Sequence, residues 1–237
     1  MKSRSLTALV VTALLTAGGA WAQGPAALVA KVSAKSLTCA DFDKDSPVAH
    51  ESRALRMAPE GAKRVSDHDL AVNTKAGVHR FIDKKPYREE LGGFHWSYCG
   101  YLPALRAHLI GMEDEDLFTG KLLLDGDGRV LDGGQTVYPS PSGKLFLAAS
   151  QEDGDELERW VISDMSGRRL WAGPSGVIKT ENKIEIAALE FEAPLWISDD
   201  AIRVTATCGD SLGTKGPMTL THEGKVWRWK TGLRCKD

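Results

Sequence analysis

The sequence predicts an all-β fold of antiparallel meander sheets in a propeller-like array, incomplete or irregular, that follows a less regular N-terminal segment. Short apolar stretches alternate with acidic or glycine-containing turns, and these breaks recur about every 8–12 residues, as in multi-stranded antiparallel domains. Residues 103–134 and 142–173 also align without gaps at an offset of 39 positions, with eight identities in 32 positions. A repeat of about 40 residues matches the length of a propeller blade.

Residues 1–22 have the pattern of a secretory signal peptide. Lys2 and Arg4 precede an apolar run, and Ala20 and Ala22 in the Ala-Trp-Ala sequence form a small-residue cleavage site. We therefore expect a single all-β domain over residues 23–237. The apolar run is too short for a membrane anchor, and no later stretch approaches the roughly 18 apolar residues of a spanning helix. We therefore expect a periplasmic or secreted protein without a membrane anchor.

The charge of the expected mature chain argues against nucleic-acid binding. The signal segment contributes two of the 30 basic residues and none of the 32 acidic residues, which leaves 28 and 32 and a formal charge of −4. A nucleic-acid or anionic-membrane surface normally needs an excess of basic residues. An envelope protein or a glycan is the partner that we expect instead.

Four cysteines in an exported chain predict two disulfide bonds. No two of them form a Cys-x-x-Cys motif, which argues against a metal or redox site. Four cysteines allow three connectivities, and we favour Cys39–Cys99 with Cys208–Cys235 because each bond then ties a terminal segment to the body of the fold.

Local patterns predict the elements in order. Residues 23–75 are mixed, and Ser46-Pro47 can open a short helix that continues through residues 50–55. The strand at residues 94–98 places Phe94, Trp96 and Tyr98 on one face, which we interpret as core. The other predicted strands are at residues 78–82, 105–109, 117–124, 129–131, 136–138, 145–149, 160–162, 170–171, 184–189, 195–197, 202–207, 218–221 and 226–229.

Residues 138–145, Tyr-Pro-Ser-Pro-Ser-Gly-Lys-Leu, and the Ile-Ser-Asp-x-x-Gly sequence at 162–167 resemble a propeller blade of the TolB or WD40-like kind. A Ser-Pro-Asp-Gly-Lys turn introduces the second strand of such blades; here a serine replaces the aspartate, and the Trp-Asp dipeptide is absent. Residues 93–202 also resemble a group of uncharacterised exported bacterial β-repeat proteins. These resemblances imply a fold type and an envelope location but no catalytic residue. Residues 195–230 form a weaker third copy of the repeat.

The acidic connections at residues 113–116 and 152–156 have two interpretations. They supply oxygen ligands or paired carboxylates, or they are solvated hairpin loops, which their recurrence in both repeats favours. Asp125-Gly126-Asp127-Gly128 predicts a hairpin turn rather than a calcium loop.

Catalytic, cofactor-binding and metal-binding residues are not predicted. The six histidines lack metal-ligand spacing, and His68 between Asp67 and Asp69 is the nearest approach to a site. Nucleophile and phosphate-loop motifs are also missing. Three tryptophans are candidates for a ligand-facing role, with core packing as the alternative interpretation: Trp171, Trp227 and Trp229.

Our first hypothesis for the function is a non-catalytic exported protein that presents a protein- or glycan-binding surface. The alternative is a carbohydrate-active hydrolase whose carboxylates converge from separate blades, with Asp153, Asp155 and Asp199 as candidates. A third possibility is a structural domain with no specific ligand, which the sequence does not distinguish from the first.

Overall fold

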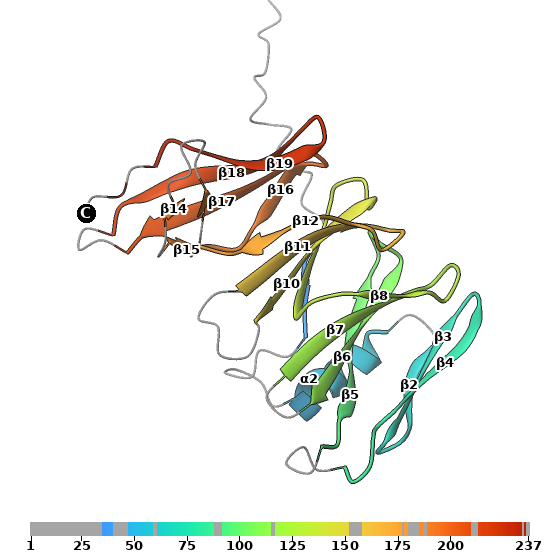
Figure 1. Cartoon of the computed structure of the whole chain (residues 1–237). Coiled ribbons are helices and arrows are strands. Elements are labelled where there is room, and N and C mark those ends of the chain that lie inside the picture. The colour runs from blue at the N-terminus through green and yellow to red at the C-terminus, as the bar shows by residue number, and fades with distance from the viewer. Residues whose placement is uncertain are drawn as a thin grey trace, which may run out of the picture.

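The computed structural model describes residues 35–39, 47–58, 61–87, 92–114, 117–151, 158–176, 178–179, 185–186, 189–209, 213–233 and 235. The predicted signal peptide and the acidic connection at 152–156, with Asp153 and Asp155, lie outside these residues. The described residues form antiparallel β-sheets and one short helix, α2 (Pro47–Arg56) (Figure 1). This confirms the predicted all-β meander fold.

Four sheets follow one another along the chain, each built mainly from consecutive strands. The first contains β2 (Ala62–Ser66), β3 (Asp69–Thr74) and β4 (Gly77–Ile82). The second contains β5 (His95–Leu102), β6 (Ala107–Asp114), β7 (Leu117–Leu124) and β8 (Val130–Asp132). The third contains β9 (Thr136–Pro139), β10 (Leu145–Gln151), β11 (Glu158–Asp164) and β12 (Arg169–Pro174), with β1 (Leu37–Thr38) beside β9.

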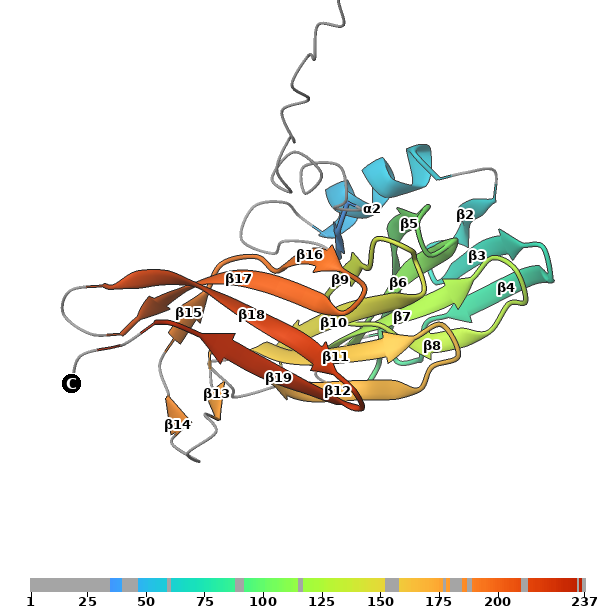
Figure 2. The ribbon, with the colours of Figure 1, turned by 90° about the horizontal axis from the view of Figure 1, so that it is seen from above.

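The fourth sheet contains β16 (Leu195–Ser198), β17 (Ala201–Cys208), β18 (Lys215–Glu223) and β19 (Val226–Thr231), and β15 (Leu189–Phe191) also pairs with β17. A separate two-stranded sheet joins β13 (Ile178–Lys179) to β14 (Glu185–Ile186). The four main sheets form a row with the first and the fourth at opposite ends (Figures 1 and 2). Because this row does not close into a ring within the described residues, the propeller-like part of the prediction is not confirmed.

The two segments that align at an offset of 39 residues form the same meander. Strands β6, β7 and β8 of the first segment correspond to β10, β11 and β12 of the second. The turn before the last strand carries a glycine with positive φ in both, Gly128 at 73° and Gly167 at 89°, a conformation that favours glycine. Asp114 pairs directly with Leu117, so the first acidic connection belongs to a β-hairpin, as the loop interpretation requires.

Apolar residues between successive sheets form three core clusters. Alternation along a strand gives each middle sheet two apolar faces, one toward each neighbour. The buried members include Leu70, Phe81 and Tyr98 between the first and second sheets, Leu109, Leu122 and Phe146 between the second and third, and Leu147, Ile202 and Val204 between the third and fourth. Stacked sheets that bury both faces explain why the strands are so apolar in a chain of modest overall hydrophobicity.

Helix α2 occupies the position that the Ser46-Pro47 pattern predicts, and it packs Ala54 and Leu55 against the cluster between the first and second sheets. Glu51 fixes the helix to strand β5 by accepting a hydrogen bond from the Tyr98 amide at 2.7 Å. The sequence pattern missed the two strands that follow, β2 and β3. Tyr98 is fully buried, as predicted, whereas Phe94 and Trp96 are partly exposed.

Both predicted disulfide bonds are present, Cys39–Cys99 and Cys208–Cys235. The first ties the residue after β1 to strand β5, and the second ties the end of β17 to the C-terminal segment. Bonds of this kind are typical of proteins that fold in oxidising compartments. Among the described residues, no helix has the length and apolar character needed to cross a membrane.

Candidate functional site

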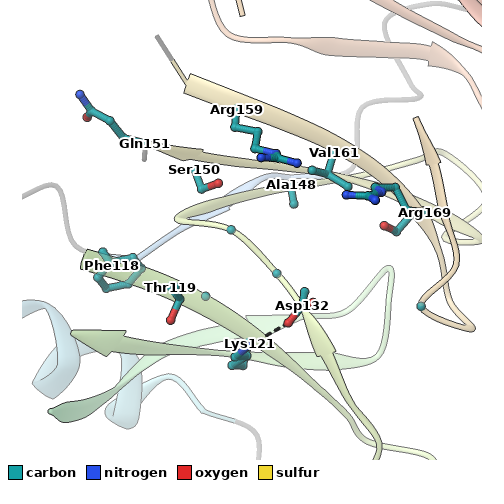
Figure 3. Close-up of a pocket in the computed structure, with 15 residues that line it drawn as sticks. Phe118, Thr119, Lys121, Asp132, Ala148, Ser150, Gln151, Arg159, Val161 and Arg169 are labelled. Atoms are coloured by element: carbon teal, nitrogen blue, oxygen red, sulfur yellow. Dashed lines mark hydrogen bonds and ion pairs between the residues drawn. The ribbon is translucent and has the colours of Figure 1, made fainter. Parts of the chain in front are cut away.

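A cleft of ≈ 570 Å³ lies between the second and third sheets (Figure 3). Strands β7 and β8 form one wall, and strands β10, β11 and β12 form the other. Its lining residues are Phe118, Thr119, Gly120, Lys121, Asp132, Gly133, Gly134, Ala148, Ser150, Gln151, Arg159, Val161, Ser163, Gly167 and Arg169. We refer to it as the inter-sheet cleft.

Glycines bring the two walls together where the β8–β9 connection passes between them. The Gly133 amide donates a hydrogen bond to the Gly120 carbonyl oxygen at 2.8 Å. A Cβ atom on Gly120 would lie 2.0 Å from the Gly134 carbonyl oxygen, and one on Gly134 would lie 2.5 Å from that of Ala149. Only backbone fits in this space, so the glycines set how closely the two sheets approach.

The third-sheet wall is basic because of the alternation along β11. Trp160 and Ile162 point into the core toward the fourth sheet, which leaves Arg159, Val161 and Ser163 for the opposite face. Arg169 on β12 lies directly opposite Ser163 in the strand register. Figure 3 shows the side chains of Arg159 and Arg169 turned toward Val161, which lies between them.

The second-sheet wall holds an ion pair between cross-strand partners. Lys121 Nζ lies 2.8 Å from Asp132 Oδ1, and the two residues are opposite each other on β7 and β8. The inter-sheet cleft thus contains three basic side chains and one acidic side chain among its described lining residues. Arg169 is exposed, and its side chain forms no hydrogen bond or ion pair with another described residue.

Asp199, a candidate for the hydrolase alternative, lies outside the inter-sheet cleft. It is in the β16–β17 turn and accepts a hydrogen bond from the Ser142 amide at 3.1 Å, which joins the third and fourth sheets. Burial acts to raise the pKa of Asp199, but hydrogen bonds from Ser142 and Ser140 outweigh burial and lower it. A carboxyl group held ionised in this way is suited to a structural contact and not to donating a proton.

A second polar cluster lies at the edge between the first and second sheets, and we call it the Asp83 cluster. The Asp83 side chain is 2% exposed, and its Oδ2 lies 3.2 Å from His68 Nδ1 and 2.7 Å from His95 Nδ1. Its Oδ1 accepts a hydrogen bond from the Trp96 amide at 2.8 Å. The His68 ring stacks on Tyr87, with ring centroids 3.7 Å apart.

Arg64 connects the Asp83 cluster to helix α2. Its guanidinium lies 3.2 Å from His95 Nε2 and donates to Glu51 at 3.0 Å. Since arginine only donates hydrogen bonds, His95 accepts through Nε2 and donates through Nδ1 to Asp83. His68 thus has Asp83 as its partner rather than the neighbouring Asp67 or Asp69 that the sequence suggested.

The Asp83 cluster surrounds a cavity of only ≈ 40 Å³. No group of three or more His, Cys, Asp or Glu side chains in the described part of the chain is arranged to hold a metal ion. The side chains of this cluster come from four separate segments of the chain, and no regular spacing in the sequence predicts that they lie together. We interpret this cluster as a structural network.

The three candidate tryptophans lie between the third and fourth sheets, away from the inter-sheet cleft. Trp227 is 5% exposed and packs edge-on against Trp196, with centroids 6.1 Å apart, so it is a core residue, as the alternative interpretation predicts. Trp171 and Trp229 are partly exposed and meet edge to face at 6.4 Å. The side chains that line the inter-sheet cleft were not predicted as site residues.

Comparison of the chain with protein-family models, with curated proteins and with solved structures gave no match.

Proposed function

We propose that this protein is an exported, non-catalytic binding protein. Its inter-sheet cleft binds the anionic group of a ligand. The observation that carries the proposal is the charge of the cleft, whose described lining residues include three basic side chains, Lys121, Arg159 and Arg169, and a single carboxylate, Asp132. Arg169 points into this space without a partner among the described residues. Guanidinium groups form their strongest hydrogen bonds with carboxylates and phosphates.

Export is supported by the sequence and by the cysteines. Residues 1–22 have the pattern of a signal peptide, and all four cysteines pair in disulfide bonds. We place the mature protein in the periplasm or outside the cell, where such bonds persist.

Binding fits the residues of the cleft better than hydrolysis does. Glycoside hydrolysis uses two carboxyl groups that flank the scissile bond. Asp132 is the single carboxylate among the described lining residues, and Lys121 neutralises it at 2.8 Å. A carboxylate paired with a lysine is suited to orienting a ligand, and the described lining residues supply no second carboxyl group for a hydrolytic pair.

The proposal is tested by NMR titration of the ¹⁵N-labelled protein with three anionic probes: inorganic phosphate, hexaglutamate and trigalacturonate. We expect at least one probe to shift the amide signals of Gly120, Gly133 and Gly134. The shifts should disappear in Arg169→Gln and persist in Arg168→Gln, because Arg168 is exposed and pairs with Asp164 outside the cleft. If no probe shifts these signals, or if both variants behave alike, the cleft is not an anion-binding site.

A further inference from the structure

We infer that the ligand of the inter-sheet cleft is a carboxylated sugar, a ring that carries one carboxylate and several hydroxyl groups. This inference rests on the proposed function, and it concerns the chemical class of the ligand. It follows from three properties of the cleft: the position of the arginines, the hydroxyl groups beside them, and the Lys121–Asp132 ion pair on the opposite wall.

The two arginines are placed to share one anionic group. Arg159 is four residues from Ser163 on strand β11, and Arg169 lies opposite Ser163, so their Cα atoms are separated by about 13 Å along the strand. Both long side chains turn toward Val161 between them (Figure 3). A planar carboxylate above Val161 lies within reach of both guanidinium forks, whose geometry suits bidentate binding of carboxylates.

A serine stands beside each arginine on the same wall. Ser150 is the cross-strand partner of Arg159, and Ser163 is the cross-strand partner of Arg169. Gln151 and Thr119 add an amide and a third hydroxyl to the lining. Hydroxyl and amide groups donate and accept hydrogen bonds, so they complement sugar hydroxyl groups, which do the same.

The opposite wall favours a ligand group that donates hydrogen bonds. The Asp132 side chain is 93% exposed and uses Oδ1 to bind Lys121, which leaves Oδ2 to accept a hydrogen bond from the ligand. A sugar hydroxyl group can donate that hydrogen bond, whereas a carboxylate of an acidic peptide has no proton to donate. A basic wall opposite a wall with one free acceptor oxygen thus suits a ligand with a negative charge at one end and hydroxyl groups at the other.

The size of the cleft supports a small ligand. Its volume of ≈ 570 Å³ falls within the range of about 300–1,000 Å³ for small-molecule sites. Stable protein–protein interfaces are instead broad surfaces that bury about 1,200–2,000 Å² in total. One or two sugar rings match the inter-sheet cleft better than a folded partner does.

The experiment compares binding of trigalacturonate, of acidic oligosaccharides built from mannuronate or N-acetylmuramate, of neutral maltotriose and of hexaglutamate, measured by calorimetry on the disulfide-bonded protein. We expect at least one acidic oligosaccharide to bind, and maltotriose to bind at least about tenfold more weakly. Arg169→Gln should weaken binding of the acidic oligosaccharide by about 10- to 100-fold, as expected for loss of a charged hydrogen-bonding group, while Arg168→Gln leaves it unchanged.

Asp132→Asn separates a sugar ligand from a peptide ligand. It should weaken binding of the acidic oligosaccharide, because an acceptor for a sugar hydroxyl group is lost. It should strengthen any residual binding of hexaglutamate, because Lys121 loses the carboxylate that neutralises it. If hexaglutamate bound in an Arg169-dependent way and no acidic oligosaccharide bound, the inference of a carboxylated sugar would be wrong and the proposed function would stand. If maltotriose bound as tightly as the acidic oligosaccharides, the carboxylate of the ligand would have no role in binding, and the inference would be wrong. Binding of no anionic probe, phosphate included, would remove both proposals.

Discussion

The hydroxyl oxygen of Tyr98 lies 3.0 Å from Nδ1 of His108, and both side chains, which come from the neighbouring strands β5 and β6, are buried. Burial is the main cause that raises the pKa of Tyr98, with a smaller contribution from Tyr101. Burial also lowers the pKa of His108, although the charge of Asp125 acts in the opposite direction. The pair is therefore neutral in the folded protein near pH 7.

This neutral pair makes the stability depend on pH. Unfolded histidine titrates near pH 6.5, whereas buried His108 has a lower pKa, so the unfolded chain binds more protons between the two values. The contribution of His108 to the free energy of unfolding should be constant above about pH 6.5 and fall as the pH decreases toward the lowered pKa. His108→Gln should flatten this part of the pH profile in urea unfolding experiments. His222→Gln is the control, since His222 pairs with exposed Asp200 at the surface. If the free energy of unfolding of His108→Gln depended on pH as steeply as that of the wild type, the prediction would be contradicted.

Asp83→Asn should destabilise the protein by about 2–3 kcal/mol, because hydrogen bonds to a buried charged group are each worth about 1.5–3 kcal/mol. Asp83 Oδ2 binds two imidazoles and Oδ1 accepts a hydrogen bond from the Trp96 amide, whereas an asparagine keeps one acceptor oxygen and its nitrogen cannot accept the hydrogen bonds made by the other. Asp200→Asn is the matched control, because its Oδ1 binds His222 at 3.1 Å and its side chain is 71% exposed; it should cost less than about 1 kcal/mol. Chemical denaturation measures both, and equal losses would show that the Asp83 cluster is not a structural network.

Gly120→Ala should be among the most damaging single substitutions in the inter-sheet cleft. Its new Cβ would lie 2.0 Å from the Gly134 carbonyl oxygen, and backbone atoms cannot move aside without separating the two sheets. Overpacking of this kind costs about 1–3 kcal/mol or more. Gly126→Ala is the control, since nothing lies within 4 Å of its new Cβ. Thermal unfolding should show a large decrease in melting temperature for the first variant and almost none for the second.

Removal of the Cys208–Cys235 bond by a double Cys→Ser substitution should cost about 3.5 kcal/mol on the loop-entropy model, since it closes a loop of 27 residues. The same change at Cys39 and Cys99, whose loop spans 60 residues, should cost about 4.3 kcal/mol. Urea unfolding of the two double variants measures both losses. A negligible loss in either variant would mean that the corresponding bond does not constrain the unfolded chain.

The sequence predicted the second, third and fourth sheets well because their strands are apolar and end at glycine or proline turns. It missed β2 because Lys63, Arg64 and Ser66 interrupt the apolar alternation of a strand at the edge of the first sheet. Tertiary pairing with β3, and not local preference, makes this segment a strand.

The candidate site was harder to predict than the fold. Arg159 and Arg169 look like ordinary exposed residues in the sequence, and only the stacking of the sheets places them opposite Lys121 and Asp132. The tryptophans gave the stronger sequence signal, yet Trp227 is in the core because an indole fills the wide space between two sheets. A linear pattern identifies which residues are unusual, whereas a cleft depends on which sheets become neighbours.

The short strand β1 links the two sheets whose walls form the cleft. Leu37 pairs with Val137 at the edge of the third sheet, and Cys39, immediately after β1, is bonded to Cys99 in the second. This short segment thus connects the two sheets by backbone pairing on one side and by a disulfide bond on the other, and the second connection forms only when both thiols are oxidised. We therefore expect the reduced protein to hold the two walls of the cleft less rigidly, and to bind the proposed ligand more weakly, than the oxidised protein.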